Sequence, residues 1–233
     1  MSASAAAARS VEEIVGGAAG RLSGAPDLAS TLRGIAAAAR SALGADRATC
    51  YVHDVEAQVI SAVYSTEVDP ERRAFLERAV GRGTARLPIL RLQLAQPDPL
   101  LAIEDITRDP TVPPALAARL GSGALIGARL EHLSVGGEGP PALLGTLFCS
   151  YVRPRRFSAS ERQAAYGLAN LAALALANAR LQAETARILA AASEASAAFQ
   201  RQRDYSAALV ASMRDGLTVL SPEGTVIEVS PSF

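Results

Sequence analysis

The sequence predicts an α/β fold in which a β-sheet carries helices on both faces and a very long helix follows it. Short segments rich in β-branched and aromatic residues alternate with helical patterns over residues 27–151. Residues 168–215 contain neither glycine nor proline, the two strongest helix breakers, so this run predicts one long helix or two nearly continuous ones. The order helix, strands, helices, strands, helix is typical of a sheet covered on both sides.

The first elements are two helices and a hairpin. A glycine-weakened helix is predicted over 10–22, and a firmer one over 27–43, where apolar residues recur on one face and Gly44 follows the end. Residues 47–54 and 58–64 favour β-structure and are bounded by turn residues. They are therefore predicted to pair as a hairpin.

The middle of the chain mixes short helices, loops and strands. The pair Asp69-Pro70 suits the first turn of a helix. Three prolines and the lack of an apolar period argue against regular structure after Gly81. The predicted elements, in order, are a helix over 70–80, an irregular crossover over 81–100, a short strand over 101–106, a short helix over 114–120 ended by Gly121, and strands over 124–133 and 143–151 separated by the turn-rich residues 134–141.

The long helix begins at a capping box. Ser158 and Glu161 have the spacing at which each side chain bonds the other residue's backbone amide. Beyond it, a 3.5-residue apolar stripe predicts a parallel homodimer, with the polar Asn178 setting its register. The predicted interface residues are Leu171, Leu174, Asn178, Leu181 and Ile188. The alternative is that residues 168–181 pack on the chain's own sheet and the rest is a solvated spacer.

Composition narrows the classes of partner and compartment. The 23 basic and 23 acidic residues cancel, and no basic block appears, so neither nucleic acid nor an anionic membrane is an expected partner. Cys50 and Cys149 lie in apolar, strand-like runs and are read as small buried side chains in a reducing compartment. The N-terminus has no export-signal pattern, so a cytoplasmic location is expected.

Residues 27–181 resemble a GAF domain, the small-molecule-binding module of signalling proteins. The resemblance rests on GADRATCYV at 44–52, LGTL at 144–147 and ALANARL at 175–181, with RRFSASE at 155–161 leading into the last helix. It implies an antiparallel GAF-like sheet with helices on both faces and a long C-terminal helix. It also implies a sensory role in a bacterial signal-transduction protein such as a two-component system.

The tail is similar to the opening of a PAS sensor domain. Residues 209–230 read as the end of a helix and two short strands joined by Pro222-Glu223-Gly224, with Ser230 where the PAS family commonly has Asn. We therefore expect an output domain beyond the chain, such as a diguanylate cyclase, a histidine kinase or a phosphatase. The predicted segments are 1–26, a leader; 27–181, the sensor domain; 182–212, a helical linker; and 213–233, a truncated PAS-like start.

The sequence offers little support for catalysis. Some GAF proteins reduce free methionine sulfoxide with several cysteines, but only Cys50 and Cys149 are present here, without neighbours that would lower a thiol pKa. His53 and His132 stand at separate strand ends without a second ligand at helical spacing, and such histidines are usually solvated. No catalytic residue and no metal site are predicted, and no cofactor is assigned.

The remaining interpretation is a binding module that signals. In GAF domains the ligand lies between the sheet and the crossover helices, which here correspond to residues 70–121. A mostly apolar pocket needs a few polar groups to orient its ligand. The predicted ligand-binding residues are Tyr51, Tyr64 and Arg129, with Glu104 and His132 as further candidates. Ligand binding would shift the population of arrangements of the long helix; the alternative is a ligand-free dimerisation spacer.

Overall fold

The computed structural model describes residues 27–132, 141–212 and 218–229, together with Gly16. It divides the chain into two compact units, Met1–Ala179 and Arg180–Phe233. The predicted helix over 10–22 lies outside the described residues apart from Gly16, as do Ser230 and nearly all of the turn-rich segment 134–141.

The first unit is built on one antiparallel sheet in the order β2-β1-β5-β4-β3. Its strands are β1 (Arg47–Asp54), β2 (Val59–Ser65), β3 (Leu100–Ile103), β4 (Ala124–His132) and β5 (Ala142–Tyr151). The predicted hairpin is confirmed as β1 and β2, in which Tyr51 faces Val63 and Cys50 faces Tyr64. Because side chains alternate along a strand, neighbouring residues on β1 and β5 point to opposite faces of the sheet.

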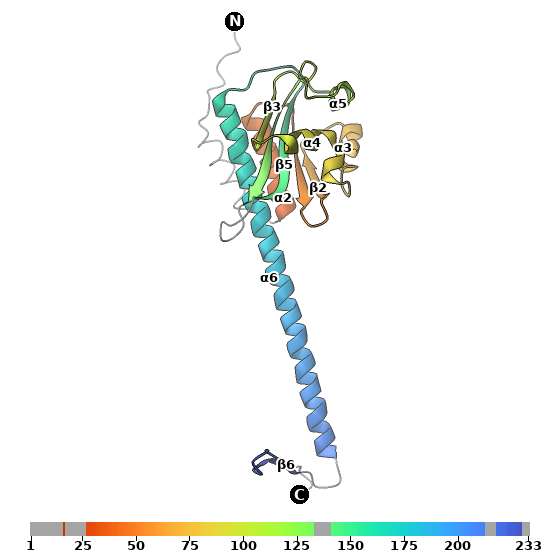
Figure 1. Cartoon of the computed structure of the whole chain (residues 1–233), viewed down its shortest axis with the longest axis vertical. Helices are drawn as coiled ribbons and strands as arrows, with labels where there is room; N and C mark the ends of the chain where they lie inside the picture. The colour runs from red at the N-terminus through yellow and green to blue at the C-terminus, as the bar shows by residue number, and fades with distance from the viewer. Residues whose placement is uncertain (1–15, 17–26, 133–140, 213–217, 230–233) are drawn as a thin grey trace. The chain divides into compact units, whose positions relative to one another are not determined.

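Helices cover both faces of this sheet (Figure 1), as the predicted fold class requires. The helical elements are α2 (Leu28–Ala42), α3 (Pro70–Glu77), the 3₁₀ turn η1 (Thr84–Arg86), α4 (Pro88–Ala95), α5 (Pro114–Leu120) and α6 (Ala159–Ser212). The helices α2 and α6 pack on one face, here called the first face. The segments from α3 to α5 lie over the other, here called the second face.

The predicted irregular crossover over 81–100 is wrong, because it contains η1 and α4. Pro88 occupies the first turn of α4, where its missing amide costs nothing, and Pro97 and Pro99 follow the end of the helix. Ile89 and Leu90 are buried in the core of the second face. The prolines therefore bound this helix instead of preventing it.

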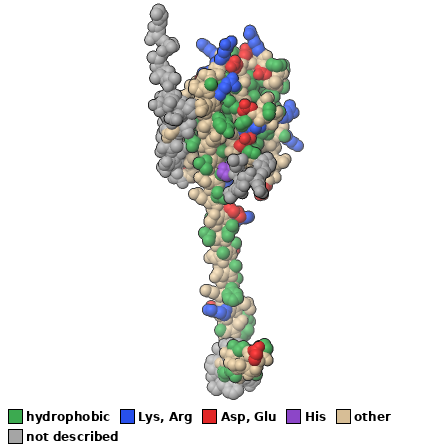
Figure 2. Space-filling view, turned by 60° about the vertical axis from the view of Figure 1, so that its left-hand side comes forward, with side chains coloured by type: hydrophobic (Ala, Val, Ile, Leu, Met, Phe, Trp, Pro, Cys, Tyr) green, Lys and Arg blue, Asp and Glu red, His purple; other side chains and the backbone are tan. Residues whose placement is uncertain are grey.

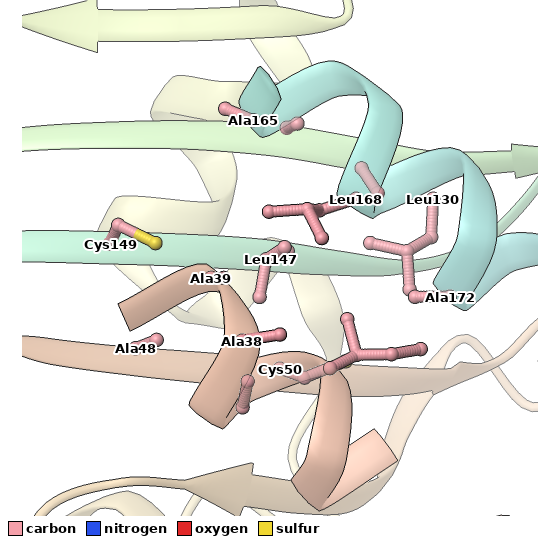
Figure 3. Close-up of a cluster of buried hydrophobic side chains, with 14 of the residues drawn as sticks. Ala38, Ala39, Ala48, Cys50, Leu130, Leu147, Cys149, Ala165, Leu168 and Ala172 are labelled. Atoms are coloured by element: carbon pink, nitrogen blue, oxygen red, sulfur yellow. The ribbon is translucent and has the colours of Figure 1, made fainter. Parts of the chain in front are cut away.

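The core of the first face is made largely of small side chains. Figure 3 shows Ala38 and Ala39 of α2, together with Ala165 and Ala172 of α6, over strand residues that include Cys50, Leu147 and Cys149. Alanines on a helix allow its backbone to approach the sheet closely, and interiors packed in this way leave few voids. Leu168 adds a large side chain that is completely buried.

Side chains cap the starts of α2 and α6, and the capping box of α6 was predicted. Asp27 precedes α2 and accepts a hydrogen bond from the amide of Ser30 at 2.8 Å, which lowers the pKa of Asp27. At α6, the amide of Glu161 donates to Ser158 Oγ at 3.2 Å, while the amide of Ser158 donates to Glu161 Oε2 at 2.9 Å. The capping box thus fixes the first turn of α6.

The long helix presents an apolar stripe to solvent. Leu174, Leu181 and Ile188 are 52%, 56% and 59% exposed, whereas Leu171 packs partly against the core of the first face. Asn178 is also exposed. No helix in the described part of the chain is long and apolar enough to cross a membrane.

The described part of the tail forms a small hairpin. Its strands are β6 (Thr218–Leu220) and β7 (Val226–Val229), which pair antiparallel across the predicted turn at Pro222-Glu223-Gly224. Gly224 has a φ of 84°, which glycine adopts without strain.

Candidate ligand-binding pocket

A cavity of about 580 Å³ lies between the second face of the sheet and the segments from α3 to α5. Its size falls within the range of small-molecule sites. The lining contains an apolar group, namely Tyr51, Phe75, Leu76, Ala79, Leu87, Pro88, Ile89, Pro113, Ala115, Leu116, Leu120, Leu125 and Phe148. It also contains a polar group, namely Arg47, Thr49, Glu67, Arg72, Arg78, Arg82, Arg86, Arg91, Arg119 and Ser150.

Aromatic side chains from two adjacent strands form part of the floor. The rings of Tyr51 on β1 and Phe148 on β5 meet edge to face, with centroids 6.1 Å apart. Phe148 lies over Gly127 of β4, where a Cβ would overlap the Phe148 ring and come within 2.8 Å of Gln93 Oε1. Burial raises the pKa of Tyr51 to about 12, so its hydroxyl is a neutral hydrogen-bond donor at physiological pH.

The outer wall comes from α3 and α5, and its large exposed apolar side chain is that of Phe75. Phe75 is 40% exposed, and two cations approach its ring. The guanidinium carbon of Arg78, the residue that caps the end of α3, is 5.6 Å from the ring centroid, and that of Arg119 on α5 is 5.2 Å away. Both distances fall within the range of cation–π attraction.

An ion pair joins the elements at one edge of the cavity. Arg47 Nη1 lies 3.2 Å from Glu67 Oε2, and Arg47 Nη2 donates to Ser122 Oγ at 2.5 Å. Glu67 Oε1 accepts from the amides of Val68 and Asp69 at 2.9 and 3.1 Å. Burial alone raises the pKa of Glu67, but these hydrogen bonds and Arg47 outweigh it and hold the pKa below its ordinary value. This pair therefore ties β1, the loop before α3 and the turn after α5 together.

The rest of the polar lining is strongly basic. All 23 basic residues of the chain are arginines, and seven of them line the cavity against a single carboxylate, Glu67. Arginine side chains project from the surface of the domain as the blue groups in Figure 2. Among the described residues, Arg47 is the one cavity arginine with a carboxylate partner. The cavity thus combines an apolar floor with an excess of positive charge.

The arrangement of a five-stranded antiparallel sheet, a cavity under crossover helices and a long C-terminal helix matches one known family. The GAF domain model matches residues 27–176, which is more than half of the chain. The chain belongs to the GAF domain family. No curated protein matches the chain by sequence.

Solved structures share the GAF fold at low sequence identity. The GAF domain of a phosphoenolpyruvate-protein phosphotransferase from Coxiella burnetii is 18% identical, with a TM-score of 0.56 over 77% of this chain and 99% of that one. Free methionine-R-sulfoxide reductase from Neisseria meningitidis is 15% identical, with a TM-score of 0.56 over 78% and 96%. The chromophore-binding domain of a bacteriophytochrome from R. palustris is 20% identical, with a TM-score of 0.53 over 74% and 61%.

Of the five predicted ligand-binding residues, Tyr51 lines this cavity of the GAF domain and the other four do not. Tyr64 lies on the first face, where it packs against the core under Arg33. Arg129 pairs with Glu131 at 2.7 Å and donates to the carbonyls of Gln96 and Pro97, so it holds the loop before β3. The remaining two also lie outside the cavity lining: Glu104 is paired with Arg162, and His132 ends β4.

The GAF domain's cysteines and histidines lie away from the cavity lining. Cys50 and Cys149 sit on adjacent strands, as predicted, but they face α2 and α6. Burial raises the pKa of each thiol to about 12. His53 is buried, against the expectation of a solvated side chain, and His132 is half-buried. Within the described ranges, no three His, Cys, Asp or Glu side chains gather as metal ligands would.

The cavity arginines were missed in the sequence, although a local signal existed. Residues 72–91 hold six arginines and one carboxylate, Glu77. The balanced charge of the whole chain hides this concentration, whereas a count over a short window would have found it.

Proposed function

We propose that this GAF domain binds a small molecule in the cavity of the second face and reports its presence through α6. One observation carries the proposal, namely that the strand forming part of the cavity floor also packs against the long helix. Phe148 of β5 lines the cavity, while its neighbour Leu147 lies in the core shared with α6. GAF domains are a small-molecule-binding sensory fold, which supports this function.

The helix α3 is the mobile wall in this proposal. None of its eight residues is buried. It is held by the Asp69 cap, which accepts from the amides of Glu71 and Arg72, and by Arg73, whose guanidinium donates to the carbonyl of Glu67. Elements with few buried apolar contacts open at low free-energy cost. A ligand that contacts α3 and the floor together would therefore favour one position of α3 and shift the population toward it.

The readout we propose is a homodimer formed along α6. Leu174, Leu181 and Ile188 expose apolar surface that a second copy would cover, with Asn178 setting the register. Residues 213–233 would lead into a PAS domain and an output domain such as a diguanylate cyclase, a histidine kinase or a phosphatase. In this arrangement ligand binding changes the tilt or register of the paired helices.

The observations favour binding over methionine sulfoxide reduction. Both cysteines lie on the first face of the sheet, so neither thiol reaches the cavity. Their raised pKa values also leave almost no thiolate at neutral pH. Tyr51 is the predicted ligand-binding residue that we retain, because its ring forms part of the floor.

Native mass spectrometry of the chain purified from cells tests the proposal. The expected result is a mass of two chains plus a stoichiometric small molecule that is lost in the Leu125→Arg variant, whose new side chain would fill the floor. Leu174→Arg should instead give a monomer that keeps the ligand. The contrary result is a dimer that carries no small molecule and is not stabilised by any small molecule from cell extract. That result would favour a ligand-free dimerisation spacer and refute the sensor function.

A further inference from the structure

We propose that the ligand is an organic anion with at least two negative charges on an apolar body, held across the cavity mouth by arginines of α3 and α5. This inference rests on the proposed function of the cavity and adds the chemical class of its ligand. A dicarboxylate and a phosphate monoester both meet this requirement, because each presents negatively charged oxygens that accept hydrogen bonds from guanidinium groups.

The first step is the unbalanced charge of the cavity. Elsewhere on the domain, Arg129, Arg155 and Arg162 each have a carboxylate partner. The cavity arginines other than Arg47 have no carboxylate within 4.0 Å among the described residues. Charges of one sign in a cleft with low-dielectric walls raise the local concentration of the opposite ion. The cavity is therefore suited to an anion.

The second step is the convergence of arginines from two helices. Arg78 at the end of α3 and Arg119 of α5 approach the same Phe75 ring. Arg72 of α3 lies against the end of α5, because its Nη2 is 2.8 Å from the position of a Cβ on Gly121. Gly121 has a φ of 55°, so a side chain there is disfavoured and the space stays open for Arg72. Several guanidinium groups at one mouth match several negative charges, since each forms paired hydrogen bonds with a carboxylate or phosphate.

The third step is the apolar floor beneath these charges. Tyr51, Leu125 and Phe148 offer rings and a branched side chain to the interior of the cavity. Inorganic phosphate or a small hydrophilic acid would leave this surface uncovered, whereas an aromatic or aliphatic body removes it from water. The Tyr51 hydroxyl provides one further donor for an oxygen of the ligand.

An anion bound in this way would join α3 to α5. The side chains of Arg78 and Arg119 carry like charges, and both lie against the exposed ring of Phe75. Neutralising those charges removes their mutual repulsion and orders α3, the wall that buries no residue of its own. Ligand charge would thus determine how strongly the cavity closes.

Isothermal titration of the whole chain with matched probes tests this inference. The dianions are naphthalene-2,6-dicarboxylate and 2-naphthyl phosphate, and the neutral counterparts are naphthalene-2,6-dicarboxamide and 2-naphthol, all at pH 7.5. The dianions should bind at least about tenfold more tightly than their neutral counterparts. Their affinity should also fall as the salt concentration rises. A preference for one dianion distinguishes a carboxylate site from a phosphate site.

Charge variants locate the anion site. Arg78→Gln/Arg119→Gln should weaken dianion binding roughly 10- to 100-fold and leave the neutral probes unchanged. Arg78→Lys/Arg119→Lys should fall between, because lysine keeps the charge and loses the paired geometry. Arg40→Gln/Arg201→Gln removes two exposed arginines that are not among the residues lining the cavity, and it should bind like the original chain.

Each contrary result has a distinct meaning. Equal affinity for neutral and dianionic probes would overturn the anion inference and leave the small-molecule sensor standing. An anion preference that survives in Arg78→Gln/Arg119→Gln would overturn the assignment to α3 and α5. Failure of every probe to bind would overturn both the inference and the proposed use of the cavity.

Discussion

Replacing Glu67 with Gln should destabilise the domain by about 2–3 kcal/mol. The two side chains of the Arg47–Glu67 pair are 15% and 6% exposed, so water screens them little. Removing one partner of a buried pair costs about 3–5 kcal/mol, because the other charge is left without compensation. Here Arg47 keeps Ser122 Oγ and the carbonyl of Gly121 as acceptors, and the glutamine oxygen can still accept from backbone amides. These remaining bonds place the expected loss below that range.

The reactivity of the thiols at increasing urea concentration measures the free energy of unfolding of the sheet-containing domain by itself. Cys50 and Cys149 are the two cysteines of the chain and are almost completely buried, so they react with a thiol reagent when the sheet unfolds. The exposed part of α6 carries no cysteine and does not contribute to this signal. Glu77→Gln removes an exposed carboxylate of α3 and serves as the control, with an expected change within about 0.5 kcal/mol.

A double-mutant cycle with Arg47→Met isolates the pair. We expect a coupling energy of at least about 1 kcal/mol between positions 47 and 67. If Glu67→Gln unfolds at the same urea concentration as Glu77→Gln, or if the two positions show no coupling, the pair does not hold the edge of the cavity and the reasoning fails.

Three further predictions concern pH, packing and capping. Because the pKa of Glu67 is lower in the folded protein, its contribution to the unfolding free energy is complete above its ordinary value of 4.5 and is lost as pH falls through the lower folded value. Glu67→Gln should therefore reduce the fall in unfolding free energy that urea titrations show below pH 4.5. Gly145→Ala should cost about 3 kcal/mol in urea unfolding, because its Cβ would overlap the Tyr51 carbonyl oxygen on β1; an unchanged midpoint would contradict this contact. Ser158→Ala should lower the free energy of unfolding by about 1 kcal/mol in the same assay, and Ser160→Ala should lower it much less. Equal effects of the two substitutions would show that the capping box does not fix the start of α6.

Local patterns predicted most of the helices and strands. The cap at Ser158 involves two residues three apart in the chain, so their spacing alone identifies a helix start. The helix α4 was missed because prolines were read as interruptions, although Pro88 begins it. A proline at a helix start and a proline in a loop look alike until the apolar residues after it are known to be buried.

Which strand residues line the cavity depends on register, which the separate strands do not reveal. Tyr51 and Tyr64 were predicted to face one ligand, but Tyr64 pairs with Cys50, whose side chain faces α2 and α6. Val63, the partner of Tyr51, packs on the second face, as does Ile60 of the same strand. A shift of one residue in the turn would exchange these two roles. The arginines were missed for a different reason, because the balanced charge of the whole chain hides their concentration in residues 72–91.

The alanine-rich contact between α6 and the sheet limits how that interface can respond. Alanine has no side-chain rotamers, so Ala165, Ala169, Ala172 and Ala173 cannot absorb a displacement by repacking as leucine or methionine would. A shift of the central strand must then move the helix as a rigid rod or break the contact. A displacement of the strand would therefore pass to the helix with little loss to side-chain rearrangement, and the alanine content of the contact is the reason.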